Sequence, residues 1–142
     1  MMKRCLAVTG TFLPYNDVTT QLLYKQLRLL PFQYDVCALE GDGSDPSFEK
    51  KISADPNYQK FKIISPFKYR DATFSIKNVN LIKALRTVDQ YVNYAINMYD
   101  SHDVVYTASL PCYTTRVGMA LKQKNPNIKW IASFSDPINH SP

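Results

Sequence analysis

Short apolar runs alternate with longer stretches of helical periodicity along this chain, and this alternation constrains the fold more than any other feature. Each run has the length of a strand that is buried on both faces. The predicted strands occupy residues 4–10, 34–39, 61–65, 103–107 and 129–134. Because the runs are separated by helical segments rather than by tight turns, they predict parallel strands joined by crossover helices.

The first helix is predicted between the first two strands. Asp17 is suited to cap its amino end, and Pro31 ends it. Residues 47–59 have no clear period, so we expect a loop there with at most a short helix. The apolar positions that define the first helix are Val18, Leu22, Leu23, Leu27 and Leu30.

Two further helices complete the predicted pattern. The longest covers residues 77–99, where apolar residues recur every three or four positions. Pro111 opens the last helix, and Asn125 with Pro126 ends it. The predicted fold class is therefore α/β, a doubly wound Rossmann-like parallel sheet in a three-layer α/β/α sandwich. We expect the common strand order 3-2-1-4-5.

The composition is that of one globular domain. The chain has 142 residues, 45% of them hydrophobic, and its 10 tyrosines and 7 phenylalanines exclude a disordered chain. The apolar stretch at residues 5–14 is far shorter than the roughly 18 residues of a membrane span, and no signal-peptide cleavage site follows it. Cys5, Cys37 and Cys112 form no CxxC pair, so we expect reduced, buried thiols in a cytoplasmic protein.

The predicted strand order brings the loops after the first, fourth and fifth strands to one carboxyl edge, where such sheets bind ligands. Asp136, just beyond the fifth strand, is the predicted catalytic residue, because a carboxylate there can orient a hydroxyl or accept its proton. Turn chemistry of the Asp136-Pro137 pair explains these residues equally well. The predicted substrate-binding residues are Gly10, Thr11, Asn16, Asp17, Ser109, Arg116, Ser135 and His140.

Several classes of site are not expected. The motifs GxGxxG and GxxxxGK[ST] are absent, so we do not expect a tightly held NAD or ATP. His102 and His140 are too few for a metal site, so no metal is predicted. Ser109 lacks the G-x-S-x-G pattern of a hydrolase nucleophile. Helix amino ends at Asp17 and Pro111 favour anions or hydroxyls, although Asp17 as a cap already accepts from some of these donors.

Basic residues are concentrated in one segment. The formal net charge is +5, and seven basic residues interleaved with aromatic ones fall within residues 60–86, where Asp71 is the only acid. This pattern suits an anionic membrane surface or a phosphorylated ligand, and it equally suits a solvated loop and helix face. A nucleic-acid partner is not expected, because no helix is basic enough and no recognised motif is present.

Two segments resemble a known family. The run KRCLAVTGTFLP at residues 3–14, which leads into an amphipathic helix, is similar to the opening of group 1, family 4-like glycosyltransferases of the GT-B fold. The run WIASFSDP at residues 130–137 is similar to a later strand and loop of the same N-terminal domain. The resemblance covers residues 3–140, but a glycine pair common in the first loop of the family is replaced here by Asn16-Asp17-Val18.

The resemblance implies that residues 1–142 are a single Rossmann-like acceptor-binding domain, with the C-terminal nucleotide-sugar domain absent. The whole enzyme would transfer a sugar from a nucleotide-sugar donor to a saccharide or lipid-linked acceptor in polysaccharide biosynthesis, and this part alone would be inactive. By resemblance, Gly10 and the loop through Asp17 border the acceptor and the donor phosphates, and Asp136 faces the transferred sugar. No metal or other cofactor is implied. A lipid-linked acceptor would place residues 60–86 peripherally at the inner face of the membrane.

A second hypothesis comes from a different class of protein. The chain would then be a stand-alone flavodoxin-like binding or regulatory module without catalysis. The acidic cluster of receiver-type modules requires paired acids at the end of the first strand, and Val8-Thr9-Gly10 supplies none.

Overall fold

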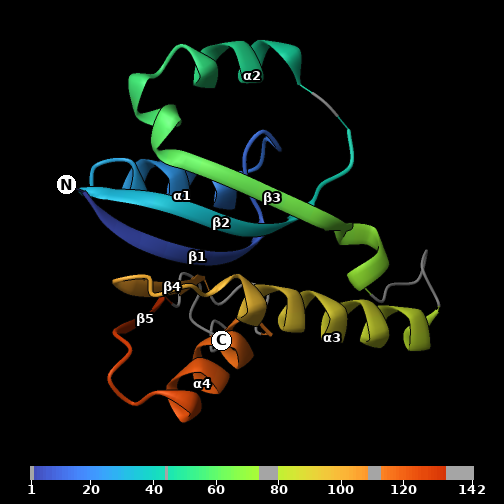
Figure 1. The fold of residues 1–142 in the computed structure, drawn as a ribbon. Helices are drawn as coiled ribbons and strands as arrows, with labels where there is room; N and C mark the ends of the chain where they lie inside the picture. Colours follow the sequence, from blue (N-terminus) through green and yellow to red (C-terminus); the bar gives the residue numbers. More distant parts are fainter. Residues whose placement is uncertain (1, 44, 74–79, 109–112, 134–142) are drawn as a thin grey trace, which may run out of the picture.

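A five-stranded parallel sheet with helices on both faces forms the molecule (Figure 1). The computed structural model describes residues 2–43, 45–73, 80–108 and 113–133. The strand order is β3-β2-β1-β4-β5, which confirms the predicted fold class and topology. In chain order the elements are β1 (Lys3–Thr11), α1 (Val18–Leu27), β2 (Phe32–Glu40), α2 (Pro46–Ser53), the 3-10 helix η1 (Pro56–Lys60), β3 (Phe61–Lys68), the 3-10 helix η2 (Tyr69–Ala72), α3 (Leu81–Met98), β4 (Val104–Ala108), α4 (Thr114–Lys124) and β5 (Trp130–Ser133).

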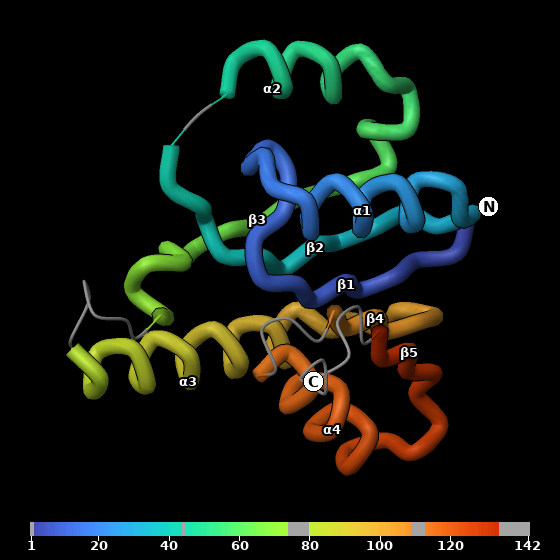
Figure 2. Tube along the Cα trace, turned by 180° about the vertical axis from the view of Figure 1, so that it is seen from behind, coloured from blue at the N-terminus to red at the C-terminus, as the bar shows by residue number. Residues whose placement is uncertain are grey.

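The central strand β1 divides the core into two halves. Alternate side chains of a strand point to opposite faces, so Cys5 and Ala7 pack on the side of α1, and Leu6 and Val8 pack on the side of α3 and α4. All four side chains are buried. Seen from front and back, α1 and α2 lie on one side of the sheet and α3 and α4 on the other (Figures 1 and 2).

Helix α1 begins where the sequence predicts and ends earlier. The Asp17 carboxylate accepts a hydrogen bond of 2.6 Å from the backbone amide of Thr20, which confirms it as the N-cap. The helix ends at Leu27, and residues 28–31 form a turn, so the predicted helical position of Leu30 is wrong. Two of the apolar positions that define the predicted helix, Val18 and Leu22, lie in α1 but do not face the core, because they are 72% and 54% exposed. The buried positions are Thr20, Leu23, Tyr24 and Leu27.

Residues 47–59 contain more helix than predicted. Asp45 and Asp55 each cap a short helix that has proline in its first turn, an arrangement that starts helices without any apolar period. Helix α2 buries none of its residues completely. It lies over α1 and the edge of the sheet, where it is partly exposed to solvent (Figure 1).

The last two helices agree with the predicted segments as far as the structure describes them. Asn80 caps α3 by accepting a hydrogen bond of 2.9 Å from the amide of Lys83. The predicted starts of α3 near residue 77 and of α4 at Pro111 lie outside the described residues. Helix α4 ends at Lys124, directly before the predicted Asn125-Pro126 stop.

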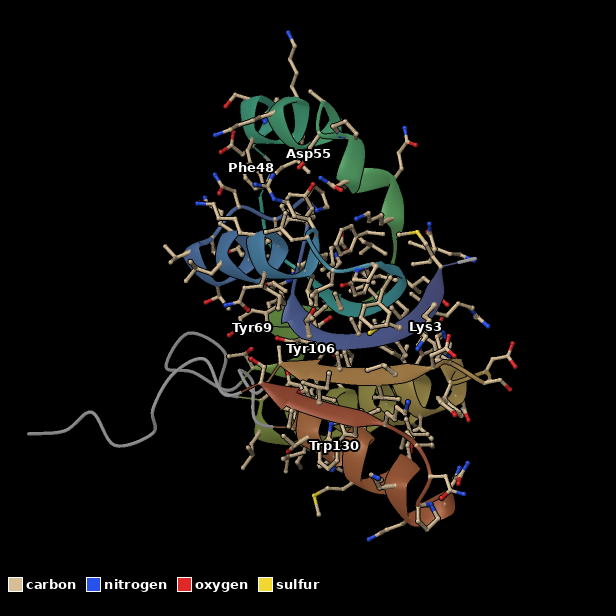
Figure 3. The ribbon with its side chains drawn as sticks, turned by 90° about the vertical axis from the view of Figure 1, so that its left-hand side faces the viewer. Lys3, Phe48, Asp55, Tyr69, Tyr106 and Trp130 are labelled. Carbon is tan, nitrogen blue, oxygen red and sulfur yellow. The ribbon has the colours of Figure 1, made fainter. Side chains whose placement is uncertain are left out.

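Trp130 on β5 packs against a glycine in α4. Its indole Nε1 donates a hydrogen bond of 3.0 Å to the hydroxyl of Thr107 on β4, which fixes the ring beside the helix (Figure 3). A Cβ atom at Gly118 would overlap the Trp130 ring. Glycine has a poor helix propensity, so its presence here is explained by the close approach of the ring.

We predict that Gly118→Ala destabilises the protein by about 1–3 kcal/mol, because the overlap outweighs the helical preference of alanine. Urea unfolding followed by Trp130 fluorescence measures this directly, since Trp130 is the single tryptophan. The neighbouring exposed residue provides a control, and Met119→Ala should leave the midpoint nearly unchanged. A Gly118→Ala protein as stable as the parent would show that the ring does not need this space.

Asp55 joins α1 to the segment that precedes β3. Its carboxylate accepts hydrogen bonds from the Asn57 amide (3.0 Å), the Tyr24 hydroxyl (2.7 Å) and Arg28 (2.9 Å). The Asn57 amide has the largest effect, followed by Tyr24, and together with Arg28 these donors lower the pKa of Asp55 to about 2. Hydrogen bonds to the charged form of a carboxyl group favour ionisation.

We expect this hydrogen-bonded carboxylate to make stability depend on acid. A group whose pKa is lower in the folded than in the unfolded state stabilises the fold above its unfolded pKa and loses this effect as the pH falls through its folded pKa. For Asp55 the loss runs from its ordinary value of 3.8 to about 2. Asp55→Asn should therefore reduce the pH dependence of the free energy of unfolding between these pH values, as measured by denaturant titration at each pH. An unchanged slope would contradict the assignment.

Candidate functional site

Three predicted site residues come together after β1. Thr11 ends the strand, and its hydroxyl donates a hydrogen bond of 3.1 Å to the carboxylate of Asp17. The other oxygen of Asp17 caps α1. Asn16 donates a hydrogen bond of 2.7 Å to Asp45, the N-cap of α2. These residues therefore hold the start of α1 and the start of α2 against the end of β1. Gly10, the fourth predicted residue here, lies within β1.

Of the remaining predicted residues, the structure describes only Arg116. Arg116 lies on α4 and pairs with Asp89 of α3 at 3.0 Å on the exposed surface, where such pairs contribute little. Ser109, Ser135, Asp136 and His140 lie outside the described residues. Their predicted roles, including that of Asp136 as a catalytic residue, stay predictions.

A pocket of about 570 Å³ opens at the carboxyl ends of β1, β2 and β3. We call it the carboxyl-edge pocket. Its volume lies within the range of small-molecule sites, about 300–1,000 Å³. The wall on the β1 side comes from the loop after the strand, and the opposite wall comes from α2, η1 and β3. The side chains that give it its chemistry are Tyr15, Glu40, Glu49, Tyr58 and Ser65.

The pocket follows from irregular strand ends. Pairing between β1 and β2 shifts register between Val8 and Thr11, and pairing between β2 and β3 shifts between Cys37 and Leu39. Such irregularities bend a strand and redirect its side chains. Beyond them the ring of Tyr15 lies against Gly41, where a Cβ atom would overlap it. Glycine at position 41 thus allows Tyr15 to cover the start of the β2–α2 loop.

The lining of the carboxyl-edge pocket is acidic, aromatic and hydroxylic. Glu40 and Glu49 supply carboxylates, and Tyr15 and Tyr58 supply ring faces and hydroxyls. None of the described residues that line it is basic. Carboxylates accept strong hydrogen bonds from hydroxyl groups and repel other anions. The pocket is therefore suited to a neutral polyhydroxylated ligand and disfavours a phosphate group.

The sequence did contain a signal for one of these lining residues, Glu40, which is its position at the end of a predicted strand. Glu40 ends β2, and the carboxyl ends of parallel strands share one edge. The prediction that residues 47–59 are largely loop concealed the contribution of Glu49 and Tyr58. Glu49 and Tyr58 belong to short capped helices that have no fully buried residues, so no apolar periodicity marks them in the sequence.

A second polar cluster lies at the opposite edge of the sheet. His102 is buried, and its Nδ1 accepts a hydrogen bond of 3.0 Å from the amide of Asp100. This leaves the proton on Nε2, which donates to Asp35 at 2.7 Å, and Arg4 also pairs with Asp35 at 3.1 Å. Burial raises the pKa of Asp35, but these hydrogen bonds outweigh it and lower the pKa overall. The cluster joins β1, β2 and the start of β4, which is a structural role.

Other reactive groups do not add to the site. Cys5 and Cys37 are buried, and burial, the largest effect, raises the pKa of each thiol to about 12, so neither is a thiolate nucleophile at neutral pH. Cys112 lies outside the described residues. Within the described part of the chain, no three histidine, cysteine or acidic residues come together as metal ligands. No described helix is both long and apolar enough to cross a membrane.

Comparison with known proteins shows the fold and no family. No protein-family model matches the chain, and no curated protein matches it. Among solved structures, the N-terminal domain of Candida albicans trehalose-6-phosphate phosphatase superposes with a TM-score of 0.51 and 16% identity. The match covers 93% of this chain and 33% of that one, so this chain spans about a third of the length of the protein it resembles.

This comparison corrects the assignment that the sequence resemblance implied. A group 1 GT-B glycosyltransferase was expected, and with it a nucleotide-sugar donor, polysaccharide biosynthesis and glycosyl transfer as the activity of the whole enzyme. The solved domain that the chain resembles belongs to a phosphatase, and neither a family model nor a curated protein supports a glycosyltransferase. The glycosyltransferase assignment is therefore wrong. The Rossmann-like α/β fold that was predicted with it is confirmed.

Proposed function

We propose that this chain is a carbohydrate-binding α/β domain that holds a neutral mono- or disaccharide in the carboxyl-edge pocket. The observation that carries the proposal is the lining of that pocket, in which two carboxylates and two tyrosines face a volume of about 570 Å³. The sugar is the saccharide partner that the sequence already suggested, now without a transfer reaction. No catalytic step is proposed.

The chemistry of the lining favours a sugar over other small ligands. Sugar hydroxyls donate to the carboxylates of Glu40 and Glu49, and such charge-assisted hydrogen bonds are stronger than neutral ones. The rings of Tyr15 and Tyr58 offer apolar faces to the C–H groups of a sugar ring. Ser65 adds a hydroxyl that both donates and accepts. An anion would meet two negative charges without a described basic residue to offset them.

The structural comparison contributes the fold to this proposal and not the ligand. The solved domain of similar fold belongs to a trehalose-6-phosphate phosphatase, a protein whose name contains a sugar phosphate. The identity of 16% carries the fold alone, so the ligand class rests on the pocket. We further propose that the bond between Asn16 and Asp45 positions α2, and with it Glu49, at the pocket.

Isothermal titration calorimetry tests the proposal with glucose, trehalose and trehalose 6-phosphate as probes. We expect the neutral sugars to bind more tightly than the phosphorylated one, because the carboxylates repel phosphate. Tyr15→Ala should weaken binding roughly tenfold, which corresponds to about 1.4 kcal/mol. Glu49→Gln should weaken binding of the neutral sugars and reduce the discrimination against trehalose 6-phosphate.

Asp89→Asn is the matched control for the charge change at Glu49. Asp89 is an exposed acid on α3 that does not line the pocket, so its substitution should leave sugar affinity unchanged. Two results would contradict the proposal. One is that none of the neutral sugars gives a heat of binding, and the other is that Tyr15→Ala and Glu49→Gln bind them as well as the parent.

We also propose that residues 60–86 contact an anionic membrane surface, which would give a cytoplasmic protein a peripheral position at the inner face. The specific observation in favour is at the start of α3, where Leu81, Ile82 and Leu85 are exposed. Lys83 and Arg86 lie between and beside them in sequence, so this turn of the helix offers both the apolar and the basic side chains that interfacial helices use. Tyr69 of η2 is exposed as well, and Figure 3 shows it at the carboxyl edge.

Cosedimentation with vesicles tests this contact. Vesicles of phosphatidylserine and phosphatidylcholine should retain more protein than pure phosphatidylcholine, and raised salt should release it, because screening weakens attraction to anionic lipids. Ile82→Ser should reduce retention severalfold, whereas Met119→Ser should not. The two residues are 71% and 53% exposed, but Met119 lies on α4. Equal retention by both vesicle types would remove the proposal.

A further inference from the structure

A second pocket, of about 490 Å³, lies between α1 and α2. We call it the α1–α2 pocket. Helix α1 lines it with Tyr24 and Lys25, its C-cap residue Arg28 adds a guanidinium, and helix α2 lines it with Phe48, Lys51 and Ile52. Figure 3 shows Phe48 and Asp55 below α2, toward α1. The proposed sugar site does not use any of these side chains.

The two pockets contact different sides of α2. Residues three and four apart lie on one side of a helix, so Phe48, Lys51 and Ile52 share the side that faces α1. Glu49 lies beyond the edge of this side, about 60° from Ile52 and about 160° from Lys51 around the helix axis, since each residue turns it by about 100°, and it lines the carboxyl-edge pocket. One short helix therefore presents a basic and apolar side to one pocket and an acid to the other.

The α1–α2 pocket carries a net positive charge. Lys25, Arg28 and Lys51 line it, and Asp55 is the one acid among its described lining residues. Asp55 already accepts hydrogen bonds from Arg28 and Tyr24 inside the pocket wall and from the Asn57 amide. Its charge is thus matched by Arg28, and the charges of the two lysines are left for a ligand.

Arg28 has more N–H donors than the one that pairs with Asp55. Its Nη1 pairs with Asp55 at 2.9 Å. Its Nε is shielded from solvent and has no hydrogen-bond partner among the residues that the structure describes. A shielded donor without a partner costs free energy. The Arg28 side chain as a whole is 37% exposed, so its other guanidinium N–H groups are the ones that an oxyanion in the pocket can reach.

The rest of the lining is apolar and aromatic. Phe48 and Ile52 are half-buried and pack only along the margin of the core on the α1 side. Tyr24 is buried, with its hydroxyl already donated to Asp55, so what it offers the pocket is ring surface. Apolar walls next to unsatisfied positive charge are complementary to a molecule that has both an apolar body and an anionic group.

We propose that the α1–α2 pocket is a second binding site, specific for a small amphiphilic anion. The apolar body lies against Phe48, Ile52 and the Tyr24 ring, and the anionic group is bound by Lys25, Lys51 and Arg28. The site is independent of the proposed sugar site, because the two pockets have no lining residue in common.

Fluorescence titration with 8-anilinonaphthalene-1-sulfonate tests this site, since the probe combines an aromatic body with a sulfonate. N-phenyl-1-naphthylamine has a closely similar body without the charge and should bind more weakly, and inorganic phosphate alone should bind most weakly. Lys51→Glu should weaken binding of the sulfonate probe roughly fivefold, because it reverses a charge beside the anion. The matched control is Lys50→Glu, an equal charge change at an exposed α2 residue outside the lining.

Amide chemical shifts locate the bound probe and report whether each variant is folded. Shifts confined to α1, α2 and the residues around Asp55, with the rest of the spectrum unchanged, would support the site. The proposal would be overturned if Lys50→Glu and Lys51→Glu weakened binding equally, if the uncharged probe bound as tightly as the sulfonate, or if the shifts spread through both halves of the core. Tyr15→Ala should leave sulfonate binding intact, so failure of the sugar proposal is distinguishable from failure of this one.

Discussion

Burial of β1 on both faces and both edges is the constraint on which the rest of the structure depends. The strand pairs with β2 on one side and with β4 on the other, and its side chains from Cys5 to Val8 enter both halves of the core. A strand in this position requires helices above and below it. It also requires its parallel partners to end beside it, which brings the β1, β2 and β3 loops to one edge.

The polar groups near the end of β1 stabilise the arrangement at that edge. The Tyr91 hydroxyl of α3 donates to the backbone carbonyls of Thr9 and Cys37, close to the register shifts that interrupt regular pairing. On the other face, Asn16 connects the β1–α1 loop to Asp45. The strand ends are therefore held from both sides, and α2 lies where it borders two pockets of opposite charge.

The fold was largely predictable, and the pocket was not. The parallel sheet and its order follow from apolar runs such as residues 4–10 and 103–107. Strands buried on both faces must pair with other strands in the middle of the sheet, which restricts the possible strand orders. Asp17 was found because capping is a local interaction. Glu49 and Tyr58 were missed because α2 and η1 are short and incompletely buried, so no apolar period marks them. The family resemblance misled, because Rossmann-like strands look alike in proteins of different activity.

By itself the sequence determined the number of strands, their alternation with helices and the amino-terminal cap of α1, because these depend on local periodicity and on hydrogen bonds between residues close in the chain. Only the tertiary structure decided that Tyr15 covers Gly41, that Glu49 faces one pocket while Lys51 faces another, and that Trp130 needs the space at Gly118. These features depend on contacts between segments distant in sequence. Their geometry is set by sheet pairing and helix packing, which no local pattern of residues encodes.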